Sequence, residues 1–183
     1  MTKYLITSRE FYTDTPAVFR KIFHEQSVKH MPDFALYRDK SNPNYAIQAE
    51  HFVEVCSQMQ GLKSFIHSDV DLARALNATG VHLTSKEFDK IEYAKSLYLE
   101  VIVSTHTHNE VLEAQKLGAN AVTYSPIFAT PGKGEPTGIN DLKNLLSKVE
   151  IDVFALGGIV SEEQVNAVKE TTAFGFASIR YFY

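Results

Sequence analysis

The feature that most constrains the fold of this chain is a regular alternation of short β-rich runs and amphipathic helical patterns. Strands that follow one another in this way are joined by helical crossovers and therefore run parallel. Eight such runs can be marked, at residues 4–8, 34–38, 64–67, 80–83, 100–104, 121–125, 153–156 and 174–179. Eight parallel strands with helices between them predict an α/β fold, a single-domain (β/α)₈ TIM barrel over residues 1–183.

The end of the chain departs from the regular pattern of such barrels. The 183 residues fall below the usual ~200 to 250 residues, and only four of them follow the last β-rich run. We therefore expect the C-terminal helix to be missing or replaced by a short tail. With no helix over it, the aromatic tail at 181–183 is expected to be exposed and to offer a surface for a homodimer or another partner. An open doubly wound sheet is the alternative fold.

Composition narrows the class of protein. With 44% hydrophobic and 22% charged residues the chain is typical of a soluble globular domain. A net charge of −4 with dispersed basic residues argues against a nucleic acid partner. No apolar run reaches the ~20 residues that a membrane span requires, and the N-terminus lacks the apolar core of a signal peptide, so we expect a cytoplasmic protein. The single cysteine, Cys56, lies in a helical pattern and is interpreted as a core residue.

Cationic and polar residues stand where the β-rich runs end. In a parallel barrel these ends meet at one mouth, where the chemistry of such folds takes place. The candidates, in chain order, are Arg38, Lys40, His67, Ser68, Ser104, His106, Thr130, Lys133, Gly157, Gly158 and Arg180. Their composition suits a phosphorylated small molecule.

Two glycine-rich segments are candidates for binding the phosphate. Residues 124–138 predict a strand that leads through a long loop with Lys133 to a helix beginning near Gly138. Gly157 and Gly158 follow the seventh run, and glycine lets backbone N–H groups approach an anion closely. An ordinary long loop and a tight turn are the alternatives. Arg180 follows the eighth run, and its side chain either contacts the same phosphate or belongs to a solvated tail.

Two histidines at strand ends could move protons near neutral pH, namely His67 and His106. His82 lies inside a β-rich run, and we interpret it as a structural, hydrogen-bonded residue. The histidine spacings do not resemble a zinc site.

Taken together, these residues resemble the thiamine phosphate synthase/TenI superfamily over nearly the whole chain. Six motifs occur in order: Arg-x-Lys at 38–40, Val-Asp-Leu-Ala at 70–73, Gly-Val-His-Leu at 80–83, Val-Ser-Thr-His-Thr at 103–107, Pro-Ile-Phe-x-Thr-x-x-Lys at 126–133 and Gly-Gly-Ile at 157–159. The resemblance implies a barrel that acts late in thiamine biosynthesis. Synthases join an aminopyrimidine diphosphate to a thiazole phosphate with the help of Mg²⁺, and some TenI proteins isomerise the thiazole phosphate carboxylate without a metal.

Departures from the synthase pattern decide between these activities. Synthases carry Asn-Asp where this chain has His67-Ser68, and a second metal-binding aspartate where it has Glu87. Hard dications depend on such carboxylates. The glutamine before Arg-x-Lys is Leu36 here. The tautomerase pattern is also incomplete, because its histidine after the sixth strand is replaced by Pro126.

We therefore expect a TenI-like, metal-independent isomerase that needs no cofactor and binds a thiazole phosphate. Gly138, Gly157 and Gly158 would hold the phosphate through their amides, Arg38 and Lys133 the remaining charge, and His67 with His106 the proton. One alternative is a divergent thiamine phosphate synthase using Mg²⁺ on Glu87. The other is a non-catalytic regulator that retains the ligand pocket.

Overall fold

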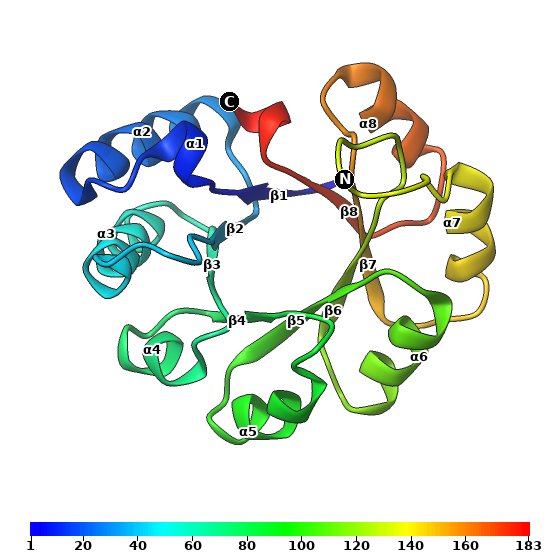
Figure 1. Cartoon of the computed structure of the whole chain (residues 1–183), viewed down its shortest axis with the longest axis horizontal. Helices are drawn as coiled ribbons and strands as arrows, with labels where there is room; N and C mark the ends of the chain where they lie inside the picture. Colours follow the sequence, from blue (N-terminus) through cyan, green and yellow to red (C-terminus); the bar gives the residue numbers. More distant parts are fainter.

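The chain folds into a closed barrel of eight parallel strands, seen here in a computed structural model that describes residues 1–183. Figure 1 looks into the ring of strands, with the helices outside it. The strands are β1 (Thr2–Ile6), β2 (Phe34–Tyr37), β3 (Lys63–His67), β4 (Gly80–Leu83), β5 (Glu100–Thr105), β6 (Ala121–Tyr124), β7 (Asp152–Leu156) and β8 (Gly175–Ser178). Pairing of β1 with β8 closes the ring. The predicted (β/α)₈ barrel is confirmed, and the open doubly wound sheet is wrong.

Helices connect the strands on the outside of the barrel. They are α1 (Arg9–Tyr12), α2 (Pro16–His30), α3 (Tyr45–Ser57), α4 (Val70–Ala75), α5 (Ile91–Ser96), α6 (His108–Lys116), α7 (Ile139–Leu146) and α8 (Glu162–Lys169), with 3₁₀ turns η1 (Phe88–Lys90) and η2 (Arg180–Phe182). Local signals fix where they start: the Asp69 carboxylate accepts from the Leu72 N–H at 3.0 Å, and the Thr107 hydroxyl from the Glu110 N–H at 3.1 Å. None of these helices combines the length and the apolar character that crossing a bilayer requires.

The strand boundaries predicted from the sequence differ from the observed ones by at most two residues. The largest difference is in β1, which ends at Ile6 because the short helix α1 begins at Arg9. Thr7 still follows the edge of β2, since its N–H donates to the Leu36 carbonyl at 3.0 Å.

Apolar side chains form two layers, one inside and one outside the barrel. Eight buried residues fill the interior around Tyr4, whose ring contacts those of Phe34, Phe65 and Phe154. A larger cluster of 35 buried residues lies between the strands and the helices. Strand residues therefore alternate between the two layers, and this alternation decides which side chains reach the mouth.

The C-terminal tail covers the barrel instead of standing away from it. The segment lies beside α8 and α1 in Figure 1, where an eighth outer helix would stand. Phe182 is fully buried and its ring stacks on Phe176 at 5.6 Å, while Tyr183 lies 4.7 Å from Phe11. The expected short tail is confirmed. Its expected exposure is wrong for Phe182, whose ring fills the gap between the helices, and is confirmed for Tyr183, which is 50% exposed. The homodimer stays a prediction, and the exposed aromatic surface on which it was based is reduced to Tyr183 and part of Tyr181.

Candidate active site at the carboxyl ends of the strands

The ends of β7 and β8 present unpaired backbone N–H groups. The amides of Gly157 and Gly158 donate no hydrogen bond within the chain, and the same holds for Ile179 and Arg180. The Ser178 hydroxyl joins the two segments by donating to the Ile159 carbonyl at 2.7 Å, and it accepts from the Tyr181 N–H at 3.1 Å. Free N–H groups after strands seven and eight form the usual phosphate site of such barrels. Arg180 is exposed here and has no carboxylate partner.

Glycine is required at 157 and 158 by both conformation and space. Their φ angles are +105° and +69°. A Cβ on Gly157 would lie 2.7 Å from the Pro126 Cα, and one on Gly158 would lie 2.6 Å from the Ala129 carbonyl oxygen. The tight-turn alternative accounts for the positive φ values. The free amides are the additional feature that suits an anion.

The long loop after β6 is anchored on the strand beside it. The Ile127 N–H donates to the Leu156 carbonyl at 2.9 Å, and the Gly138 N–H closes the loop on the Ile127 carbonyl at 3.0 Å. The expectation that the Gly138 amide holds phosphate is therefore wrong, because this hydrogen bond occupies it. The Thr130 hydroxyl donates to the Phe128 carbonyl at 3.1 Å, so it can only accept from a ligand.

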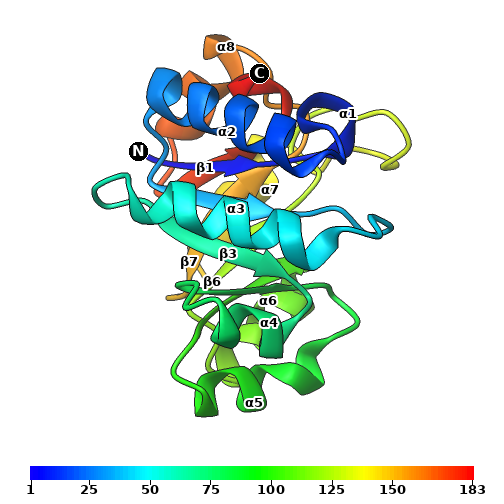
Figure 2. The ribbon, with the colours of Figure 1, turned by 90° about the vertical axis from the view of Figure 1, so that its left-hand side faces the viewer.

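Lys133 stands free at the tip of the same loop. It is exposed and has no ion-pair partner. In Figure 2 this loop and the loop after β2 both extend from the end of the barrel at which the strand arrows point. Lys133 and the loop after β2 therefore flank one mouth.

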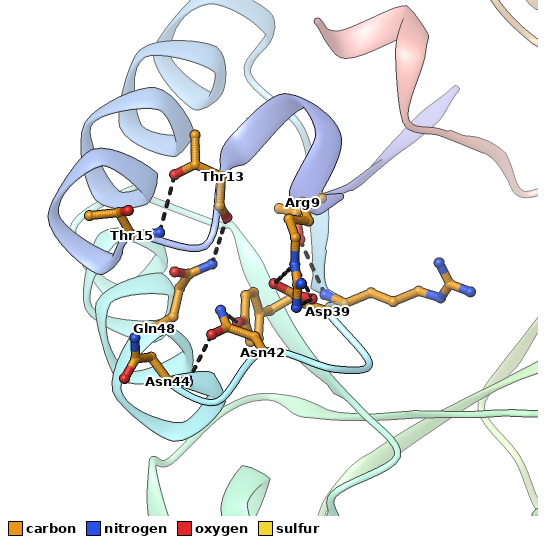
Figure 3. A network of polar contacts seen from close by, with 10 residues as sticks. Arg9, Thr13, Thr15, Asp39, Asn42, Asn44 and Gln48 are labelled. Carbon is orange, nitrogen blue, oxygen red and sulfur yellow. Dashed lines mark hydrogen bonds and ion pairs between the residues drawn. The ribbon is translucent and has the colours of Figure 1, made fainter.

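The loop after β2 carries two cations, Arg38 and Lys40, and the residue between them, Asp39, fixes the loop through a contact with Arg9. Asp39 is buried and accepts a forked hydrogen bond from Arg9, with Nη2 at 2.7 Å from Oδ1 (Figure 3). The Arg38 N–H donates to the Thr7 hydroxyl at 3.1 Å. Asp39 therefore pairs with Arg9 and leaves the charges of Arg38 and Lys40 uncompensated. Arg38 forms an ion pair with no carboxylate.

His67 ends β3 at the wall of a cavity of about 410 Å³. The cavity lies between the end of β3, α4 and α5, and Ser68, Lys90 and Tyr93 also line it. Burial lowers the pKa of His67 to about 4, and the positive charges of Arg38 and Lys40 add to this effect. His67 is therefore neutral near pH 7 and lies within the electrostatic influence of both cations.

Glu87 is fully engaged beside this cavity. Its Oε1 accepts from the Ser68 hydroxyl at 2.7 Å and from the Thr84 N–H at 2.9 Å, and its Oε2 accepts from the Lys90 ammonium at 2.5 Å. Burial alone would raise its pKa, but the hydrogen bonds from Lys90, Thr84 and Ser68 lower it to about 2. Glu87 is therefore a carboxylate at neutral pH whose two oxygens both have partners.

The side chains at this edge do not fit a magnesium ion. Position 68 offers a hydroxyl in place of a carboxylate, and Lys90 occupies the free side of Glu87. No group of three or more His, Cys, Asp or Glu side chains in the chain is arranged to hold a metal ion. Mg²⁺ is bound through carboxylate oxygens in octahedral geometry. The synthase alternative in the form that places Mg²⁺ on Glu87 is therefore not supported by the donor set.

A buried polar chain leads from the centre of the barrel to the mouth. The Tyr4 hydroxyl lies 2.7 Å from His82 Nδ1, and His82 Nε2 lies 2.9 Å from the Ser104 hydroxyl. Burial lowers the pKa of His82 to about 3, so its ring is neutral. The structural interpretation of His82 is confirmed, and its contact with Ser104 adds a positioning function. In the sequence, the only sign of this role of Tyr4 is that it brings a hydroxyl group into an otherwise apolar run.

His106 lies beyond the end of β5 and is exposed. Its Nδ1 lies 3.1 Å from the Ser125 carbonyl oxygen, which holds the ring toward the end of β6. His67 and His106 are at the ends of strands separated by β4, which places them roughly 10 Å apart by strand spacing. No contact joins them, so a paired proton transfer requires a ligand between them.

Fold and site together define a (β/α)₈ barrel whose mouth carries free backbone amides and cations without ion-pair partners. The family of thiamine monophosphate synthases (TMP-TENI) matches residues 4–182. The chain belongs to this family, as the sequence motifs indicated.

Relatives and solved structures agree with this assignment. A thiamine-phosphate synthase from Clostridium tetani is 30% identical over 97% of this chain and 86% of its own length. One from Clostridium acetobutylicum is 36% identical, but the match covers 62% of this chain and only 56% of that protein. The structure of a thiamine phosphate pyrophosphorylase from Pyrococcus furiosus superposes with a TM-score of 0.82 at 25% identity, covering 97% of this chain and 85% of that one.

Proposed function

We propose that this protein is a transferase of the thiamine-phosphate synthase type, which joins a phosphorylated thiazole to an aminopyrimidine diphosphate. The observation that carries the proposal is that two separate groups of anion-binding donors, called here the two sides, lie at one mouth. Free amides and Arg180 lie at the ends of β7 and β8, and the uncompensated Arg38 and Lys40 lie after β2. Two phosphorylated substrates require two such sides. The names of the relatives support the same reaction.

The two sides suit different anions. The amides of Gly157 and Gly158 are adjacent and free in a turn of positive φ, which suits the oxygens of a terminal monophosphate. Arg38 and Lys40 carry two unpaired positive charges that suit a diphosphate, and they stabilise the negative charge that grows as diphosphate leaves with the bond electrons. The thiazole nitrogen then forms the new bond to the carbon that the diphosphate has left.

The tautomerase remains a second candidate because of one specific observation. His67 is neutral and lies at the mouth, and no carboxylate set for a metal accompanies it. A neutral imidazole can accept a proton from a thiazole phosphate carboxylate. Its pKa of about 4 makes it a weak base, and this disfavours the tautomerase as the main function.

Calorimetric titration separates the two sides. Arg180→Met should weaken binding of the thiazole phosphate by about tenfold and leave inorganic pyrophosphate unchanged, whereas Arg38→Met should do the reverse. Lys148→Met is a matched control, because Lys148 is exposed beyond the C-terminal end of α7 and away from the mouth. Equal losses of both ligands in each variant would contradict the assignment of two sides.

A further inference from the structure

The Lys90 ammonium is held in place like a bound ion. It lies 2.5 Å from Glu87 Oε2 and 3.5 Å from the Ser68 carbonyl oxygen. The Glu87 carboxylate is itself held by hydrogen bonds from the Ser68 hydroxyl and the Thr84 N–H. The position of the ammonium is therefore fixed as well. An ammonium has three donors, and at least one is left for a ligand.

The ammonium, and not the carboxylate, faces the cavity. Lys90 lines the cavity of about 410 Å³, whereas Glu87 does not. The Lys90 side chain is 42% exposed and that of Glu87 is 18% exposed. Asp69 and Asp71 also line the cavity, but the Asp69 carboxylate caps α4 and the Asp71 carboxylate accepts from the Tyr93 hydroxyl at 2.5 Å.

Positive charge predominates around His67, at the inner end of the cavity. Arg38, Lys40 and Lys90 all lower the pKa of His67, and only Glu87 opposes them. Arg38 and Lys40 do not line the cavity, but they act on His67 from behind it and neither has an ion-pair partner.

We propose that Lys90 is a built-in cation that binds an anionic phosphate group at this cavity and takes the place of a divalent metal ion there. The inference rests on the proposed function only for the identity of the anion, a diphosphate. The exclusion of a divalent ion follows from the occupied Glu87 oxygens alone. A divalent cation would need a second carboxylate beside Glu87, and the residue at that place is Ser68, whose hydroxyl carries no charge.

Calorimetric titration with inorganic pyrophosphate in buffer containing EDTA tests the proposal. The informative variant is Lys90→Met combined with Glu87→Gln, because removing both charges leaves no unpaired carboxylate behind. It should bind pyrophosphate at least about tenfold more weakly than the wild type. Lys86→Met is the matched control, since Lys86 is an exposed neighbour whose side chain pairs with no carboxylate, and it should change the affinity by less than about twofold.

Paramagnetic resonance of Mn²⁺ tests the exclusion of a metal. The wild type should leave Mn²⁺ free in solution, and Ser68→Asp combined with Lys90→Met should bind it, because the carboxylates at positions 68 and 87 are then neighbours with no ammonium between them. Near-ultraviolet circular dichroism verifies that each variant is folded. Pyrophosphate binding by the wild type that requires added Mg²⁺ would overturn the proposal. So would an unchanged affinity in the Lys90→Met/Glu87→Gln variant, or no binding by the wild type at all. Product formation from the two substrates is measured separately, so a failed proposal for Lys90 is distinguishable from a failed function.

Discussion

The Arg9 guanidinium and the Asp39 carboxylate join the start of α1 to the loop that follows β2. Nε lies 3.1 and 3.2 Å from the two carboxylate oxygens, and Nη2 lies 2.7 Å from Oδ1. Asp39 is 7% exposed and stands between Arg38 and Lys40 in the chain. The pair therefore fixes the backbone of the segment that carries both cations.

Replacing Arg9 by methionine should weaken pyrophosphate binding although Arg9 touches no ligand. The loop would lose its forked contact, and we expect a loss of about tenfold, below the ~10²-fold that a 1 Å misplacement can cost. Calorimetric titration measures the affinity, and limited proteolysis measures the mobility of residues 39–44. Arg9→Lys should recover only part of the affinity, because lysine cannot form the fork. Unchanged affinity in Arg9→Met would show that the loop is held by other contacts.

Gly158→Ala should destabilise the protein far more than Gly132→Ala. Both glycines have positive φ, +69° and +73°, but only Gly158 has no room for a Cβ, which would lie 2.6 Å from the Ala129 carbonyl oxygen. We expect a loss of roughly 3 kcal/mol or more for Gly158→Ala, and about 1 kcal/mol for Gly132→Ala from conformation alone. Urea unfolding measures both. Equal losses would mean that the loop after β6 moves aside freely.

Tyr4→Phe should lower stability and disturb Ser104 at the mouth. The buried Nδ1 of His82 would lose its partner, at a cost of about 1–3 kcal/mol. Tyr181→Phe is the control, since its hydroxyl bonds Glu162 at the exposed surface and its removal should cost little. Urea unfolding gives the free energies. A shift of the imidazole resonances of His82 in Tyr4→Phe would report the change in its tautomer or orientation.

Stability should fall as the pH is lowered from about 7 to 4. Burial lowers the pKa of His67 to about 4 and of His82 to about 3, so the unfolded chain binds more protons than the folded one between these values and ~6.5. Each histidine can lower the free energy of unfolding by up to about 1.4 kcal/mol for each pH unit in this window. His67→Gln should reduce the slope measured by urea unfolding. The same slope in His67→Gln and the wild type would contradict the burial of His67.

The fold and the mouth could be predicted from sequence because both depend on local patterns. Apolar runs and helical periodicity located all eight strands, and parallel strands necessarily place Arg38, His67 and Ser104 at one end of the barrel. The motifs added the family, which the match over residues 4–182 confirms. The finer expectation of an isomerase rested on missing residues and stays a prediction.

The details that escaped prediction depend on contacts between distant residues. Whether the Gly138 amide is free depends on how the loop after β6 closes, and it closes on Ile127. Phe182 in the tail is buried because its ring packs on that of Phe176 in β8. Lys90 has no motif around it, and its role appears only when Glu87 and Ser68 are brought beside it.

The most direct measurement is the formation of thiamine phosphate by the purified protein from aminopyrimidine diphosphate and the aromatic thiazole phosphate carboxylate. A parallel reaction receives the non-aromatic tautomer alone, and mass spectrometry follows both. We predict product from the two substrates, strongly reduced in Arg38→Met. Conversion of the tautomer without any thiamine phosphate would contradict the transferase and establish the isomerase instead.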